Sequence, residues 1–262
     1  MDYFKDKVVI VTGGALGIGL ATCRLLGSRG AKVVFSDILK ETIAESRKEL
    51  EAEGIDLLAL ESDVSDPGHC ASLVEATIER FGRLDILINN AGVSIVSNFD
   101  ECRPEICRKL VDVNVLGSIY MTLAAVEHLK RSRGHIVFLS SVSGIRAIPT
   151  GSIYSASKAF LRSLAESLRL ELKPDGVHVG VISPGFTTSD PRKTVLRGDG
   201  AVRPIDRPPH DTLDGVAAGI AKVIERRERE RVLTPMGKAT AVLQRISPSL
   251  VDRILEGREL KN

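Results

Sequence analysis

The chain of 262 residues contains no tryptophan, only three tyrosines and four cysteines, and its net charge is +2. Nucleic acid would therefore find neither a basic surface nor aromatic residues on which bases could stack. The cysteines form no CxxC pair and the five histidines have no metal-binding spacing. We expect buried thiols of a reducing compartment, no metal site and no nucleic-acid partner.

Long apolar runs are also missing. No run approaches the roughly 18 apolar residues that span a bilayer, and charged residues occupy positions 5–7, where a secretory leader would be apolar. The sequence therefore predicts a cytoplasmic protein. Its 43% of hydrophobic and 27% of charged residues are typical of a globular protein. No change of composition divides the chain, and we predict a single catalytic domain over residues 1–262.

Short β-branched runs alternate with longer helical patterns. The strands we expect lie at residues 7–12, 31–36, 57–61, 84–88, 135–140, 177–182 and 231–234. Near-continuous apolar strands are buried on both faces of a parallel sheet, and repeated strand–helix–strand units need right-handed crossovers. The predicted fold class is α/β: a doubly wound, Rossmann-like parallel sheet of about seven strands with helices on both faces.

Two segments fall outside this alternation. Residues 187–214 contain four prolines and no periodicity, which predicts a substrate loop that closes over the site. The charges of this loop cancel, so we expect no anion-binding patch there. Residues 235–262 form an extension with an apolar stripe that Pro248 interrupts. Core cover or a subunit contact suits this extension better than docking on a membrane surface.

A glycine-rich turn directly follows the first predicted strand. Thr12 to Gly19 reads TGGALGIG, and a helical pattern begins near Ile18. Glycines at positions 13, 17 and 19 permit a tight turn and close approach of the backbone to a pyrophosphate, which the helix N-terminus would bind. A glycine-rich turn without a ligand is the alternative, but a strand before and a helix after favour a dinucleotide site.

Asp37 ends the second predicted strand, 18 residues beyond Gly19. A carboxylate there can accept hydrogen bonds from both hydroxyls of the adenosine ribose, and it would repel the 2′-phosphate of NADP. Asp37 could also cap the helix that follows, and binding of the ribose and capping of the helix are compatible. We therefore expect the cofactor to be NAD rather than NADP.

Tyr154 and Lys158 are four residues apart, hence on one face of a helix. Interconverting an alcohol and a ketone needs a proton donor and acceptor at the oxygen. We expect the ammonium to lower the pKa of the phenol, and a serine from the segment 140–144 to hold the substrate oxygen. Tyr3 and Lys7 have the same spacing without this setting, so Tyr3→Phe should be silent. The absence of a Gly-x-Ser-x-Gly elbow argues against hydrolysis.

Together these motifs resemble the short-chain dehydrogenase/reductase family over about residues 5–189. The resemblance implies a catalytic tetrad of Asn114, Ser141, Tyr154 and Lys158. It also implies three cofactor segments beyond Asp37, Tyr154 and Lys158: Gly13, Leu16, Gly17, Ile18 and Gly19 at the pyrophosphate, Asp63 and Val64 at the adenine, and Asn90, Ala91 and Gly92 along the cofactor.

On the nicotinamide side the resemblance implies Pro184, Gly185 and Thr187. The sequence departs from the family pattern here, because Thr187 replaces an aliphatic residue and Ser189 stands at the position of the usual threonine. The resemblance further implies a homodimer or homotetramer.

The predicted function is an NAD-dependent oxidoreductase that interconverts a lipophilic secondary alcohol and its ketone by hydride transfer. Apolar residues are expected around the substrate, namely Ile95, Val96, Ile145, Ile148 and Phe186. One alternative is a 3-oxoacyl-carrier reductase using NADPH, against which Ala15 and Asp37 count. The other is a non-catalytic dinucleotide-binding scaffold, against which the complete tetrad counts.

Overall fold

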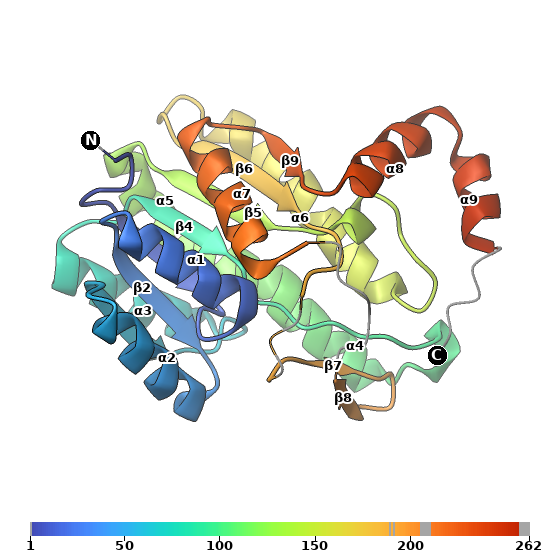
Figure 1. Ribbon diagram of the computed structural model, residues 1–262, viewed down its shortest axis with the longest axis horizontal. Helices are drawn as coiled ribbons and strands as arrows, with labels where there is room; N and C mark the ends of the chain where they lie inside the picture. The colour runs from blue at the N-terminus through green and yellow to red at the C-terminus, as the bar shows by residue number, and fades with distance from the viewer. Residues whose placement is uncertain (1, 189, 191, 205–210, 257–262) are drawn as a thin grey trace.

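A computed structural model describes residues 2–188, 190, 192–204 and 211–256 of the chain (Figure 1). At its centre lies a seven-stranded parallel sheet with strand order β3-β2-β1-β4-β5-β6-β9. The strands are β1 (Val8–Thr12), β2 (Lys32–Asp37), β3 (Leu57–Glu61), β4 (Ile86–Asn89), β5 (His135–Leu139), β6 (His178–Ser183) and β9 (Glu230–Val232). The prediction of a doubly wound α/β fold is confirmed.

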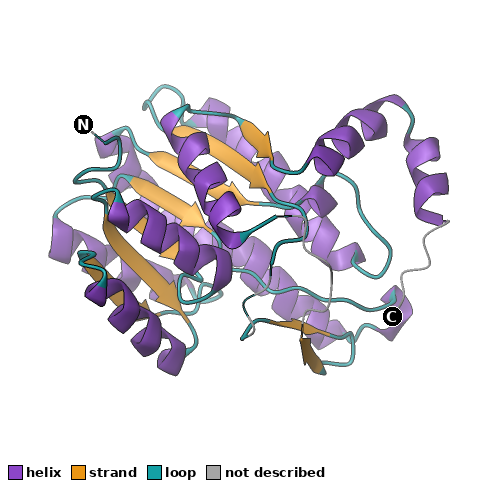
Figure 2. Cartoon of the chain, in the orientation of Figure 1, coloured by secondary structure: helices purple, strands orange, loops and turns teal. Residues whose placement is uncertain are grey.

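The inner strands explain why helices cover both faces of the sheet (Figure 2). Every residue of β1, β4, β5 and β6 is buried. Along β1, Val9 and Val11 pack on one face while Val8 and Ile10 pack on the other. Each face therefore needs its own apolar cover, as the continuous apolar sequence predicts.

Three helices pack on each face. The first face carries α1 (Gly17–Ser28), α2 (Lys40–Ala52) and α7 (Leu213–Glu225). The second face carries α3 (Pro67–Phe81), α5 (Gly117–Ser132) and α6 (Ser152–Glu171). Helix α4 (Pro104–Val111) continues into α5 through one π-helical turn, Asp112–Leu116.

The continuous helical run Pro104–Ser132 is long and apolar enough, by length and composition, to cross a membrane. We expected no such run, because polar residues interrupt its apolar ones in the sequence. Met121, Ala125 and Leu129 of α5 are fully buried in the core on the second face of the sheet. These three apolar residues of α5 therefore serve the core of this fold, whereas Leu123 of the same helix is exposed.

The substrate loop predicted over residues 187–214 holds more regular structure than its sequence indicates. Strands β7 (Thr194–Leu196) and β8 (Val202–Pro204) form an antiparallel hairpin, and the Val96 N–H donates to the Leu196 oxygen at 2.9 Å. Strands of three residues are too short to show a period, which is why the sequence predicted only a loop. Residues 189, 191 and 205–210 of this segment lie outside the described residues.

The predicted C-terminal extension consists of α8 (Pro235–Ile246) and α9 (Pro248–Glu256), which project from the body of the molecule (Figure 1). Pro248 stands at the first position of α9, where its missing N–H costs nothing. Arg146 forms an ion pair with Asp252 of α9. Residues 257–262 of the extension lie outside the described part of the chain.

Candidate functional site

The carboxyl ends of the parallel strands meet at one edge of the sheet, and Thr12 joins two of them there. Its Oγ1 accepts hydrogen bonds from the N–H groups of Asn90 and Ala91, both at 3.0 Å. The Asn90 side chain donates to the backbone oxygens of Thr12 and Gly13 at 2.8 and 2.9 Å. The side chain of Asn90 thus holds the backbone at the start of the glycine turn. No local pattern in the sequence marks Thr12 for this role.

The glycine turn has the shape that its spacing predicts. Gly13 and Gly17 have φ values of +61° and +54°, which glycine adopts without strain. A Cβ at Gly19 would lie 2.1 Å from the Gly13 oxygen, so no larger residue fits there. Leu16, the N-cap of α1, makes no side-chain capping hydrogen bond. The first N–H groups of α1 therefore receive no cap from that side chain.

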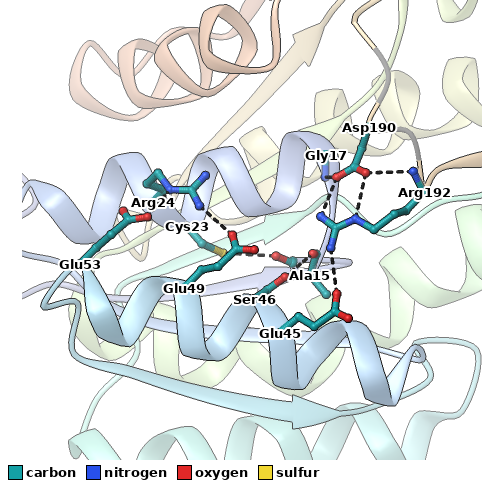
Figure 3. Close-up of polar contacts among 11 residues, drawn as sticks. Ala15, Gly17, Cys23, Arg24, Glu45, Ser46, Glu49, Glu53, Asp190 and Arg192 are labelled. Carbon is teal, nitrogen blue, oxygen red and sulfur yellow. Dashed lines mark hydrogen bonds and ion pairs between the residues drawn. The ribbon is translucent and has the colours of Figure 1, made fainter.

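This helix N-terminus accepts an anion in the structure. The Gly17 N–H donates to Oδ2 of Asp190 at 3.4 Å (Figure 3). A carboxylate of the chain itself thus stands where the sequence predicts a phosphate. The glycine cradle and this stand-in carboxylate together show that the residues present fit the pyrophosphate of a dinucleotide.

Asp37 lies between the glycine turn and the start of α2. Its Oδ2 accepts from the Ala15 N–H at 3.4 Å, and its Oδ1 accepts from the N–H groups of Ile38 and Leu39 at 2.8 and 3.4 Å. Helix α2 begins at Lys40 with Leu39 as its N-cap. Asp37 therefore accepts hydrogen bonds from the turn that precedes α2 and does not cap α2 itself.

The residues predicted at the adenine lie beyond the end of β3. Asp63 accepts hydrogen bonds from the N–H and the hydroxyl of Ser65, at 2.9 and 2.7 Å. Val64 is buried against Gly117 of α5, where a Cβ would come within 2.6 Å of the valine side chain. Their role toward adenine stays a prediction.

Asn114 lies in the π-helical turn and is fully buried. Its side chain accepts from the Val93 N–H at 2.8 Å and donates to the Val93 oxygen at 3.0 Å and to Oγ of Ser157 at 3.1 Å. A Cβ at Gly92 would lie 3.2 Å from Oδ1 of Asn114 and 3.4 Å from Nζ of Lys158. The structure therefore brings Asn114, Gly92 and Lys158 to one place.

Two serines surround the hydroxyl of Tyr154. The side chains of Ser94 and Ser141 lie near enough to this hydroxyl to lower the pKa of Tyr154. The Oγ of Ser141 is also 2.7 Å from the Oγ of Ser143. The sequence did not reveal Ser94, because it lies in the loop after β4, 60 residues before Tyr154, and belongs to none of the motifs.

Burial dominates the electrostatics of this pair. It raises the pKa of Tyr154, against the effect of the two serine hydrogen bonds, and it lowers the pKa of Lys158 to about 7, with a contribution from Lys193. The prediction that Lys158 lowers the pKa of Tyr154 is therefore wrong for this structure. The Lys158 ammonium donates to the Leu139 oxygen at 2.9 Å and lies 5.7 Å from the centre of the Tyr154 ring. A lysine with a pKa near 7 is only partly charged, so its field is weak.

The segment predicted on the nicotinamide side follows β6. The Pro184 oxygen accepts from the Val142 N–H at 2.9 Å, and Gly185 fits tightly against Thr234, where a Cβ would approach the side chain to 2.8 Å. The hydroxyl of Thr187 donates to the Gly185 oxygen at 3.5 Å. Ser189 lies outside the described residues.

The residues predicted around the substrate differ in their exposure. Ile95 is buried and forms a bridge to Leu196, whereas Phe186 is 43% exposed. Val96, Ile145 and Ile148 are half-buried in the loops that follow β4 and β5. Their contact with a substrate stays a prediction.

Tyr3, the control residue of the sequence prediction, has a buried partner in the structure, and its silence in turnover stays a prediction. Its hydroxyl lies 2.7 Å from Nε2 of His135, at the opposite end of the sheet. Nδ1 of His135 lies 3.2 Å from Nδ1 of His178. Tyr3→Phe would remove the partner of a buried imidazole, so we expect an effect on stability.

Comparisons with known proteins agree with this geometry. The family described as short chain dehydrogenase matches residues 7–199. A protein named 11-beta-hydroxysteroid dehydrogenase A, from Arachis hypogaea, is 33% identical over 94% of this chain and 73% of its own length. The 11-beta-hydroxysteroid dehydrogenase-like 2 of Arabidopsis thaliana is 32% identical, over 95% of this chain and 80% of its own length.

A solved structure provides a third comparison. A short chain dehydrogenase/reductase from Burkholderia phymatum, in complex with NAD, superposes with a TM-score of 0.83 at 25% identity. The match covers 96% of this chain and 97% of that one. With the family match over residues 7–199 and the glycine turn and Tyr154 cluster at one sheet edge, the chain belongs to the short-chain dehydrogenase/reductase family of oxidoreductases.

Proposed function

We propose that this protein is an NAD-dependent oxidoreductase that interconverts a lipophilic secondary alcohol, such as a hydroxysteroid, and its ketone. The observation that carries the proposal is the Tyr154 hydroxyl, with Ser94 and Ser141 beside it, at the sheet edge that also carries the glycine turn. Two relatives carry names of hydroxysteroid dehydrogenases, and the Burkholderia phymatum protein binds NAD.

The nicotinamide, when bound, supplies or accepts the hydride. Tyr154 supplies the proton to the substrate oxygen during reduction and takes it back during oxidation. Ser141 and Ser94 lie beside the phenol and lower its pKa, which stabilises the phenolate, and they can hold the substrate oxygen. Lys158 lies on the same helix face, one turn beyond Tyr154, and contributes positive charge when it is protonated.

Asn114 positions the loop that carries Ser94. Its two hydrogen bonds to the Val93 backbone fix the chain next to this serine. Its third bond, to Ser157, ties the same amide to α6, the helix that carries Tyr154 and Lys158. The amide thereby sets the distance between the two parts of the site. In this reading Asn114 is a positioning residue.

The preference for NAD rests on Asp37. Its carboxylate contacts the glycine turn at Ala15, so it stands where the adenosine ribose is expected. A 2′-phosphate there would set two anions side by side, which disfavours NADP. The cytoplasmic location and the homodimer or homotetramer expected from the sequence are further proposals, and gel filtration tests the second.

The test is turnover of a panel of secondary alcohols with NAD, followed by the absorbance of the reduced cofactor, in wild type and Tyr154→Phe. We expect Tyr154→Phe to lose about 10² to 10⁴-fold in kcat while binding NAD normally, because only proton transfer is lost. Tyr120→Phe, in α5, is the matched control and should keep its activity. A kcat of Tyr154→Phe near that of wild type would contradict the assignment of Tyr154 as a catalytic residue.

A further inference from the structure

Residues that follow β6 lie across the start of α1 (Figure 3). Asp190 accepts from the Gly17 N–H and is held by Arg192, whose Nη2 and Nε lie 2.9 and 3.0 Å from the two carboxylate oxygens. Arg192 also reaches Glu45 of α2 at 3.2 Å. A polar bridge therefore runs from α1 to α2 over the glycine turn.

Asp190 behaves as a bound anion at this position. The hydrogen bonds from Arg192, and a weaker one from Gly17, hold the pKa of its carboxyl below the usual range, so the group is ionised at neutral pH. A cavity of about 390 Å³ adjoins the carboxylate, lined in part by Gly17, Leu20 and Leu213. A pyrophosphate at the N-terminus of α1 would meet this negative charge.

Lys193 lies on the same side of α1. Its Nζ would be 3.8 Å, and its Cδ 3.7 Å, from a Cβ placed on Gly17. Within the described part of the chain its ammonium has no ion-pair partner. Burial lowers the pKa of Lys193, and the charges of Asp37 and Asp190 oppose this effect only in part. The charges of the loop sum to zero, as the sequence predicts, but its cations differ in their partners. Arg192 is paired with carboxylates and Lys193 is not.

We propose that Asp190 competes with the dinucleotide for the pyrophosphate site and that Lys193 completes this site. The Asp190 carboxylate occupies the N-terminus of α1 until a dinucleotide displaces it, and the Lys193 ammonium then binds the pyrophosphate. The proposal rests on the dinucleotide binding of the proposed function. It adds two residues from a segment more than 170 positions beyond the glycine turn. Like charges exclude one another at one helix end, while an unpaired lysine beside it attracts phosphate.

The experiment measures equilibrium binding of NAD, ADP-ribose and adenosine by calorimetry, without any turnover. Asp190→Asn should bind NAD and ADP-ribose about 3- to 10-fold more tightly, because the competing charge is gone. Lys193→Met should bind them about 10-fold more weakly, and Lys193→Arg should keep most of the affinity. Adenosine has no phosphate, and its affinity should be the same in all variants.

Arg203→Met, at an exposed position in β8, is the matched control for removing a cation from this segment. Circular dichroism checks that each variant is folded, and Lys193→Arg shows whether charge or packing matters. If wild type binds NAD but neither Asp190→Asn nor Lys193→Met changes its affinity, this proposal is overturned and the proposed function stands. If wild type binds neither NAD nor ADP-ribose, the proposed function itself fails.

Discussion

Acidification from about pH 7.5 to about pH 5 should destabilise this fold through the buried pair His135 and His178. The side chains are 3% and 7% exposed, and burial lowers their pKa values from 6.5 to about 3 and about 4. The positive charge of the neighbouring Arg227 contributes to the lowering of both pKa values. The Nδ1–Nδ1 contact at 3.2 Å needs one donor and one acceptor, so both rings cannot be protonated together.

The sign follows from the lowered pKa values. The folded protein keeps both rings neutral, while the unfolded chain binds protons below about pH 6.5. Stability is therefore complete above about pH 6.5 and is lost as the pH falls toward 3 to 4. At pH 5 each ring contributes a loss of about 2 kcal/mol, and the pair at most about 4 kcal/mol.

Urea unfolding at the two pH values measures this loss in wild type and in the double variant His135→Gln, His178→Gln. We expect the free energy of unfolding to fall by about 2 to 4 kcal/mol in wild type and by clearly less in the double variant. Carboxylates with lowered pKa values contribute only at more acidic pH. Equal losses in the two proteins, or none in wild type, would refute the reasoning.

Two further predictions concern the dinucleotide site. Asp37→Ala should lower kcat/KM with NAD and raise kcat/KM with NADP, so the preference for NAD should decrease. Comparable kcat/KM values of wild type with the two cofactors would contradict the assignment of Asp37 to the ribose. Gly19→Ala places a Cβ 2.1 Å from the Gly13 oxygen, so calorimetry should show loss of NAD binding and a thermal melt should show a loss of about 2 to 4 kcal/mol. Gly68→Ala, whose Cβ would approach only Asp66 Oδ1 at 3.1 Å, is its control, and equal behaviour of the two variants would contradict the argument.

The fold and the outline of the site could be predicted from the sequence because both depend on local patterns. The apolar run Val8–Val11 requires a sheet covered on both faces, and that sheet is present. The spacing of Gly13, Gly17 and Gly19 specifies the turn, since Gly13 and Gly17 have positive φ values and Gly19 has no room for a Cβ. The four-residue interval between Tyr154 and Lys158 likewise follows from helix geometry alone.

Contacts between distant segments could not be predicted in the same way. Ser94 reaches Tyr154, and Asp190 reaches Gly17, only because strands that are far apart in sequence end at one edge of the sheet. No local pattern marks Ser94 or Asp190 as a partner. The contact of Tyr3 with His135 could not be predicted for the same reason, because the two residues are 132 positions apart.

The charge state of the site was also decided by the tertiary structure. The sequence placed an ammonium near a phenol and so predicted a lowered pKa for Tyr154. In the structure Lys158 is buried and Tyr154 is half-buried, and Lys193 approaches Lys158 from another segment. A motif determines which groups are present and how they are spaced along the chain. A pKa depends on all the water that folding removes and on every charge it brings near, and both come from many elements at once.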